Sequence, residues 1–355
     1  MVREDRIHAA YEAAVLHYVQ GETMESIARR LSVSRSTVSR LIAEAKESGL
    51  VQVTIHPPQA AASELEQSIS QMFNVNAKVV PVPFGVNETR RLNAVAQIAA
   101  LTVSDLMKPK TVIGVAWGNT VAAVVDHLVP RQARGSVAVQ LNGAANASTT
   151  GVPYAGSLME EFGRAFGSEV MYFSVPAFFD YASTRDALWQ ERSISAVREM
   201  QARADVALFG IGSMTSKNRS LVYSGGYLSE TEIECLRKEG VVGDICTVLL
   251  RADGSWEDLE INSRASGPTP TDLKKIPRRI GVVSGLDKKT ATLAALRAGV
   301  ITDLVIDEDT AEQLRAYALS KMGGAHRVRH QHGCGSMRNR MMRAPGAWNK
   351  RQELR

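Results

Sequence analysis

Apolar residues recur at helical spacing in three successive segments at the start of the chain, with polar residues between them. In the third segment the spacing is i, i+3, i+4 and i+7, which predicts one buried helix face: Val38, Leu41, Ile42 and Ala45. The second segment spans residues 23–31, and Ser32-Val33-Ser34 then suits a turn followed by a helix N-cap. The pattern over residues 21–53 therefore predicts a helix-turn-helix.

The first segment, residues 7–20, is expected to complete a three-helix core through a face of larger side chains: Tyr11, Val15, Tyr18 and Val19. After the third helix, Ser48-Gly49-Leu50 supplies a stop, and residues 51–55 alternate apolar and polar as a short strand does. This strand is predicted to form part of a wing, which Pro57-Pro58 ends. Residues 1–56 are thus predicted to form a helix-turn-helix domain of winged-helix-like type.

The polar face of the third predicted helix carries side chains that suit a DNA groove. Arginine makes bidentate contacts to guanine, and hydroxyls reach base edges or phosphate oxygens. The candidate DNA-binding residues are Arg35, Ser36, Thr37, Ser39, Arg40 and Lys46. Paired amphipathic helices also occur in ordinary helical domains, but the strand behind this pair and the helix in front of it favour DNA binding.

Beyond residue 77, apolar segments of strand length alternate with helical segments. Four strands are predicted, at residues 111–117, 205–209, 279–284 and 301–306. A glycine-containing segment follows the second strand, and a predicted helix follows each of the other three. This alternation predicts a larger Rossmann-like α/β effector domain with a mostly parallel sheet over residues 63–320. It opens with a predicted helix at 63–73, and the proline-led stretch 57–62 is predicted to be a linker.

Glycines and hydroxyls follow several of these strands, at the edge where open α/β sheets bind anionic ligands. The alternative for each glycine is that the turn alone requires it. Asp307-Glu308-Asp309 is interpreted as a set of helix-capping carboxylates rather than a metal site. The sequence contains no GxGxxG or GxxxxGK[ST] motif, so neither a dinucleotide nor ATP is expected, and no cofactor is predicted.

The charge distribution refines the DNA-binding prediction. The 355-residue chain carries a formal net charge of +5, but nine basic residues against one acid lie in residues 321–355. Residues 1–56 hold seven basic and seven acidic side chains, so net charge is no argument for DNA binding. Residues 29–46, however, hold five basic residues and one acid, which places a local basic stripe where phosphate contacts are needed.

Several further classes of protein are disfavoured by the sequence. It contains no apolar run of about 18 residues that could span a bilayer, and the charged start MVREDRIH is unlike a secretory signal, so a cytoplasmic protein without a membrane partner is expected. The three cysteines show no CxxC spacing, which argues against a zinc finger or a disulfide framework: Cys235, Cys246 and Cys334.

Taken together, these segments resemble the SorC/DeoR-type sugar-binding transcriptional regulators of bacteria over about residues 8–318. The resemblance rests on the order of YVQGETMESIARRLSVSRSTVSRLIAEAKESGLVQVTI, GVAWGNT, LNGA, ADVALFGIGS, GYLSE, VVGDI and IPRRIGVVSGLDKKTATLAALRAGVITDLVIDEDTA. It implies an effector domain with the fold of sugar-phosphate isomerases and CoA-transferases, and assembly as a homodimer or homotetramer. The partners it implies are a double-stranded DNA operator and a sugar or sugar-phosphate effector.

The resemblance also implies an effector site. GVAWGNT would cradle an anion, LNGA and the glycine after strand 205–209 would border it, VVGDI would offer a carboxylate to sugar hydroxyls, and SGLDKK would add a cation. The residues so implied are Gly118, Asn119, Thr120, Asn142, Gly143, Gly212, Asp244 and Lys289. Members that bind bisphosphorylated sugars place an arginine where Asn142 stands, which argues against a second phosphate. Alternatively, Asp244 is a turn residue, and Lys289, like Lys288, is a solvated lysine at a helix start.

A sugar-phosphate isomerase with an appended DNA-binding domain is the competing interpretation. Asp205, Asp244 and Lys289 are groups that could move protons. The sequence shows no closely spaced acid/base pair, Ser/His/Asp arrangement or metal-ligand cluster, so no enzymatic activity is predicted. The expected mechanism is linkage, in which effector binding changes the spacing of paired recognition helices and thereby the affinity for DNA.

Residues 321–355 depart from the family pattern and are predicted to be a basic, disordered tail or a segment read in a shifted frame. The tail contains residue types that bind zinc, at a spacing that fits no common site: His326, His330, His332 and Cys334. No metal site is predicted there.

Overall fold

The chain divides into two compact units, residues 1–61 and residues 62–355. The computed structural model describes residues 3–51, 63–83, 85–146, 152–216 and 220–329.

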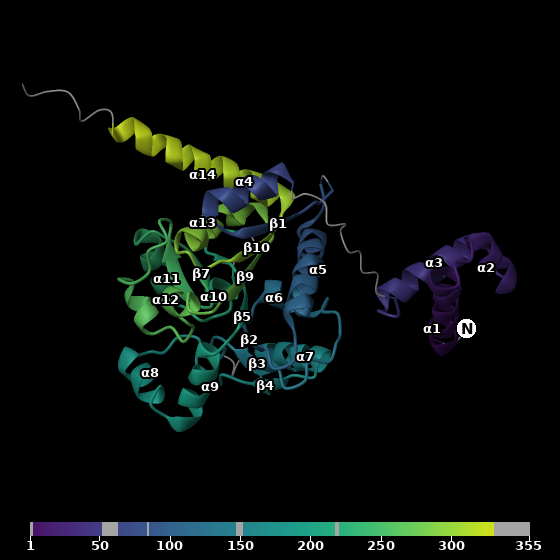
Figure 1. Ribbon diagram of the computed structural model, residues 1–355, viewed down its shortest axis with the longest axis horizontal. Helices are drawn as coiled ribbons and strands as arrows, with labels where there is room; N and C mark the ends of the chain where they lie inside the picture. Colours follow the sequence, from purple (N-terminus) through teal and green to yellow (C-terminus); the bar gives the residue numbers. More distant parts are fainter. Residues whose placement is uncertain (1–2, 52–62, 84, 147–151, 217–219, 330–355) are drawn as a thin grey trace, which may run out of the picture. The chain divides into compact units, whose positions relative to one another are not determined.

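The first unit contains three helical segments (Figure 1): α1 (Arg3–Ala14) continued by a π-helical turn η1 (Val15–Val19), α2 (Met24–Arg30) and α3 (Arg35–Glu47). Hydroxyl side chains begin the second and third helices, because Thr23 Oγ1 accepts from Ser26 N at 3.2 Å and Ser34 Oγ accepts from Thr37 N at 3.1 Å. The predicted apolar face of α3 is confirmed, since its four members are buried: Val38, Leu41, Ile42 and Ala45. The predicted wing strand after Val51 lies outside the described residues.

The expected core face of the first segment is wrong. Tyr11, Tyr18 and Val19 are 53%, 40% and 78% exposed. The side chains that are buried instead are Ala10, Ala13, Ala14 and Leu16. Alanines leave little bulk between packed helices, so α1 can lie close against α3 and the larger residues remain outside.

The second unit contains a seven-stranded sheet in which every pairing is parallel. In spatial order the strands are β1 (Asn76–Val80), β10 (Asp303–Asp307), β9 (Arg278–Val283), β5 (Val206–Gly210), β2 (Val112–Val115), β3 (Val137–Gln140) and β4 (Glu169–Met171). The four strands expected from the apolar pattern are therefore β2, β5, β9 and β10.

Helices cover both faces of this sheet (Figure 1). One face packs against α5 (Glu88–Leu106), α6 (Asn119–Val125) and α7 (Ser157–Phe166). The other packs against α4 (Glu64–Phe73), α9 (Arg192–Ala202), α13 (Lys289–Arg297) and α14 (Glu308–Arg329). In β5, Val206 and Leu208 point to the first layer while Ala207 and Phe209 point to the second. A strand buried on both faces must be apolar throughout, which explains its sequence.

A small antiparallel sheet, not expected from the sequence, lies in the same unit. Its strands are β6 (Gly212–Ser213), β7 (Val241–Ile245) and β8 (Val248–Arg251). The remaining helical segments that the structure describes in this unit are η2 (Val152–Gly156), α8 (Ala182–Leu188), α10 (Leu221–Ser224), α11 (Glu230–Lys238), η3 (Glu260–Ser263), α12 (Pro270–Leu273) and η4 (Leu286–Lys288). Because β6 follows β5 directly, the small sheet adjoins the carboxyl end of the large one.

The last helix is longer than the sequence pattern indicates. The predicted tail begins at residue 321, whereas α14 continues to Arg329. Residues 330–355, with His330, His332 and Cys334, lie outside the described residues. Within the described part of the chain, no helix combines the length and apolarity needed to cross a membrane.

Candidate functional site

A cavity of about 490 Å3 opens where the large sheet reverses its strand order. From β2 the chain moves outward through β3 and β4, then returns to place β5 on the other side of β2. Loops at such a point diverge and leave a crevice beyond the carboxyl ends of the strands. The loops after β2 and β5 line it with Trp117, Gly118, Asn119, Thr120, Gly210 and Gly212.

Three other parts of the unit complete the cavity wall. The first turn of α5 contributes Glu88, Thr89 and Leu92, and the segment before α13 contributes Ser284, Gly285 and Lys288. The hairpin between β7 and β8, with the segment before α10, contributes Ser220, Asp244, Cys246 and Thr247. The contributions of α5, Ser220 and the hairpin residues after Asp244 were not predicted, because no local motif in the sequence marks them.

The loop after β2 is anchored by Trp117. Its indole Nε1 donates to the Gly143 carbonyl at 2.8 Å, and its ring stacks on Tyr227 with centroids 5.1 Å apart. Gly118 then adopts φ +144°, a conformation that side-chain-bearing residues rarely adopt, so glycine is required at this turn. Asn119 is exposed and accepts a hydrogen bond from Tyr154 Oη at 3.2 Å. Thr120 is buried against Gly210.

Two buried acceptors in the cavity wall have no donor. Asn142 and Asp244 are 2% and 5% exposed, and neither Oδ1 atom receives a hydrogen bond from any residue that the structure describes. Buried polar atoms are rarely left in this state, because each loses its water without compensation. Both residues line the cavity, so a ligand that carries hydroxyl donors would satisfy them.

The charged groups of the cavity are perturbed by burial. Desolvation raises the pKa of Asp244 to about 6, although the neighbouring Ser220 and Tyr223 hydroxyls and the Lys288 ammonium favour its ionised form. Desolvation likewise lowers the pKa of Lys288, against the attraction of Asp244 and Glu88. Perturbed titratable groups of this kind are common in binding and active sites.

Two residues implied by the resemblance lie outside the lining. Gly143 lies behind it, with its N–H donating to Ser266 Oγ at 3.0 Å and its carbonyl held by Trp117. The Lys289 ammonium donates to Gln313 on α14 at 3.2 Å, whereas the preceding Lys288 lines the cavity. The turn η4 ends at Lys288 and α13 begins at Lys289, so neighbouring side chains take different directions. The other six implied residues line the cavity together: Gly118, Asn119, Thr120, Asn142, Gly212 and Asp244.

The candidate DNA-contact residues lie on α3 opposite its buried face. Those that are exposed are Arg35, Ser36, Ser39, Arg40 and Lys46, while Thr37 is half-buried. The Thr37 hydroxyl lies 2.8 Å from Ser34 Oγ, within the N-cap of the helix. Arg35 pairs with Glu25 at 3.1 Å. At the far end of α3, the Lys46 ammonium lies 5.6 Å from the centre of the Tyr18 ring.

Comparison with known families finds two matches, one for each unit. The family described as "Putative sugar-binding domain" matches residues 58–315. A family described as "Homeodomain-like domain" matches residues 2–54. The first match spans the cavity and the second spans all three helices of the first unit.

Individual relatives match most of the chain or a single domain of it. The deoxyribonucleoside regulator of Bacillus subtilis (strain 168) is 32% identical over 306 residues, covering 85% of this chain and 96% of its own. The full-length sorbitol operon regulator of Klebsiella pneumoniae is 28% identical, with a TM-score of 0.64 over 88% of this chain and 99% of that one. A domain of a possible sugar-binding transcriptional regulator from Arthrobacter aurescens TC1 is 43% identical, with a TM-score of 0.67 over 73% of this chain and 100% of that one.

Proposed function

Since the chain belongs to the SorC/DeoR-type family of sugar-binding transcriptional regulators, we propose that its effector is a sugar or polyol with one phosphate, bound in the cavity beside β2 and β5. The chain is a DNA-binding transcriptional regulator of carbohydrate metabolism with a sugar effector. Its relatives are named as regulators, which disfavours the isomerase alternative. The proposal concerns the chemistry of the effector and the residues that hold it.

The unpartnered buried acceptors Asn142 Oδ1 and Asp244 Oδ1 carry this proposal. Asn142 Oδ1 needs a donor, and Asp244 Oδ1 can accept one in addition to the Ser220 and Tyr223 hydroxyls that already favour the ionised carboxylate. The hydroxyls of a sugar or polyol supply donors at a spacing of a few ångströms. The Asp244 carboxylate repels a second phosphate at this end of the cavity, once it is ionised. The end of the effector that lies beside Asn142 and Asp244 is therefore expected to carry hydroxyl groups.

The phosphate is assigned to the loop Gly118-Asn119-Thr120. An oxyanion there can accept from main-chain N–H groups, the Asn119 amide and the Thr120 hydroxyl. Lys288 adds a cation to the cavity wall. The loop lies on the β2 side of the switch point, and Asp244 belongs to the small sheet beside β5, so one extended ligand can meet both groups.

DNA contact is assigned to the exposed face of α3. Arg35, Ser36, Ser39 and Arg40 would read the major groove from the first half of the helix, with Thr37 adjusting its start. Lys46 would contact a phosphate. A homodimer or homotetramer would present paired α3 helices to two operator half-sites, and effector binding would change their spacing.

A ligand screen followed by an operator assay tests the proposal. Sorbitol, erythritol and ribose, each with and without a terminal phosphate, are tested for a rise in the Tm of the full chain, because a ligand that binds the native state stabilises it. A rise with a phosphorylated member and none with its unphosphorylated partner is expected. The active compound should then change the affinity for operator DNA. Equal shifts from both forms would overturn the phosphate assignment.

A further inference from the structure

A buried ion pair lies directly behind the cavity wall. Arg91 on α5 and Asp307 at the end of β10 have side chains that are 7% and 0% exposed, and Arg91 Nη1 lies 2.6 Å from Asp307 Oδ1. The same nitrogen lies 2.8 Å from Asp309 Oδ2. Neither Arg91 nor Asp307 lines the cavity.

The second oxygen of Asp307 binds a different part of the wall. Asp307 Oδ2 accepts from Gly285 N at 3.1 Å and from Thr310 Oγ1 at 2.7 Å. Asp307 Oδ1 also accepts from Thr310 N at 3.0 Å, which caps the start of α14. One carboxylate thus connects α5, the segment after β9 and the last helix. The capping role expected for this carboxylate is confirmed, and the ion pair with Arg91 is additional.

Both segments held by this carboxylate carry cavity residues. On α5, Arg91 lies between Thr89 and Leu92, which face the cavity. In the segment after β9, Gly285 lines the cavity itself and is followed by Lys288. A displacement of either segment would alter the width of the cavity and the position of its cation.

We propose that Arg91 and Asp307 are positioning residues that hold the α5 wall and the Gly285–Lys288 wall of the cavity at the separation that the effector requires. This inference rests on the proposed function for its effect on effector binding. Its structural part, the coupling of the two walls, is independent of which effector binds. A buried carboxylate with two partners on different segments suits this role, because neither segment can move without leaving a buried group unpaired.

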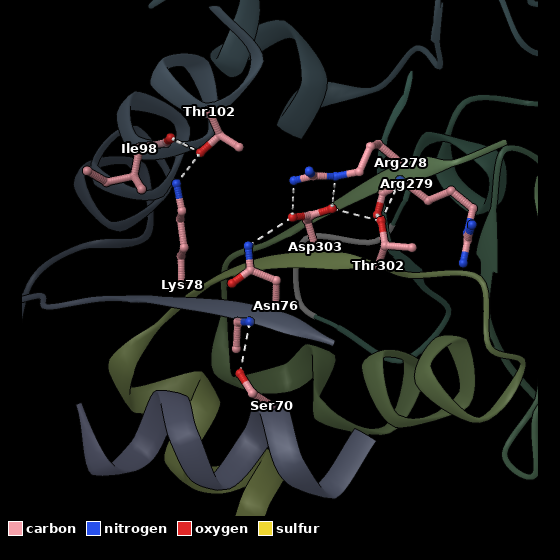
Figure 2. A network of polar contacts seen from close by, with 10 residues as sticks. Ser70, Asn76, Lys78, Ile98, Thr102, Arg278, Arg279, Thr302 and Asp303 are labelled. Carbon is pink, nitrogen blue, oxygen red and sulfur yellow. Dashed lines mark hydrogen bonds and ion pairs between the residues drawn. The ribbon is translucent and has the colours of Figure 1, made fainter. Parts of the chain in front are cut away.

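The same strand offers a matched control. Asp303 is the first residue of β10, and its side chain is 5% exposed. Its two carboxylate oxygens accept hydrogen bonds from Arg278 at 2.6 and 2.9 Å. Figure 2 shows Asn76 and Thr302 bound to the same carboxylate. Asp303 and its three partners do not line the cavity, since they lie at the opposite end of the strand. Removing its charge disturbs another buried aspartate of the same strand away from the site, although its partner Arg278 is more exposed than Arg91.

The experiment compares D307N with D303N in the full chain by amide hydrogen exchange without ligand. In D307N, exchange should rise by roughly ten-fold in both residues 88–92 and residues 284–288. D303N should leave both segments as in the wild-type protein. Equal exchange in the two variants, or a rise in only one wall, would overturn the coupling. If D307N fails to fold, R91M replaces it, because methionine keeps an unbranched apolar side chain at this position but removes the charge that pairs with Asp307.

Effector affinity is measured on the same variants with sorbitol 6-phosphate, erythritol 4-phosphate and ribose 5-phosphate. D307N should bind the active probe roughly ten-fold more weakly, and D303N should bind it as the wild-type protein does. Equal Kd values in D307N and the wild-type protein would overturn the positioning role. A wild-type protein that bound only the unphosphorylated sugars would contradict the proposed function instead, and those sugars would then serve as the probe.

Discussion

Gly212 and Asp244 pair across β6 and β7 so closely that a Cβ atom on residue 212 would lie 1.8 Å from Asp244 Oδ1. Only glycine at position 212 leaves enough space for the Asp244 carboxylate at this point in the cavity wall. The sequence motif GIGS is explained here by a close approach between two strands, in addition to the turn that follows β5.

Substitution of Gly212 by alanine should displace the Asp244 carboxylate. We expect G212A to lose about 1–3 kcal/mol of unfolding free energy through overpacking and to bind the effector at least several-fold more weakly. Chemical denaturation and ligand titration of the same preparation measure the two effects. Unchanged effector affinity in a folded G212A protein would show that the position of this carboxylate is unimportant for binding.

Removal of the Asp244 charge should affect the pH dependence of stability and the affinity for the effector in separately measurable ways. Because burial raises the pKa of Asp244 to about 6, the native state holds more protons than the unfolded state between about pH 4 and pH 6, so this group's contribution to stability falls as pH rises through that range. D244N should abolish this fall, so its unfolding free energy relative to that of the wild-type protein should rise by roughly 1–3 kcal/mol between pH 4 and pH 7. Denaturation of both proteins from pH 4 to pH 7 measures it.

The same variant should bind the effector more weakly, since an amide cannot match the carboxylate as an acceptor for hydroxyl donors. A difference in unfolding free energy between D244N and the wild-type protein that stayed constant from pH 4 to pH 7 would contradict the burial argument.

Substitution of arginines on α3 should affect DNA binding alone. R35A and R40A should each lose about 1–3 kcal/mol of operator affinity if the side chain contacts a base. If the side chain contacts a phosphate, the slope of log affinity against log salt concentration should become smaller by about one. Stability should change little, because the Arg35–Glu25 pair is well exposed. Operator titrations at several salt concentrations measure this, with R131A in the second unit as the control. Altered effector affinity in R35A or R40A would be inconsistent with separate sites.

Substitution of Glu66 should test how α4 is fastened to the sheet. Glu66 accepts from Ser63 N at 2.8 Å in a capping box and from Val79 N of β1 at 2.9 Å. E66A should therefore cost about 1–2 kcal/mol of unfolding free energy. The matched control is E64A on the same turn, which should cost less than about 1 kcal/mol because Glu64 is exposed. Equal losses in the two variants would mean that the Val79 bond contributes nothing.

Local patterns predicted the elements well. The apolar spacing of α3 corresponds to its buried face, and the four expected strands are four adjacent strands in the interior of the large sheet. These features depend on interactions between residues a few positions apart in the chain. The spacing of apolar residues along the sequence therefore predicts them directly. The predicted buried face of the first helical segment was wrong. Large side chains such as Tyr11 and Tyr18 suggest a core face by their size, but close packing of α1 against α3 buries alanines instead.

The sequence by itself determined the helix-turn-helix, the alternating α/β pattern and the motif loops that border the cavity, because each is written in consecutive residues. Only the tertiary structure decided that Lys288 rather than Lys289 reaches the cavity wall, and that Arg91 meets Asp307 from 216 residues away in the chain. The physical reason is that a cavity is built by strand order and side-chain direction. Both depend on pairings between distant segments, which no local pattern contains.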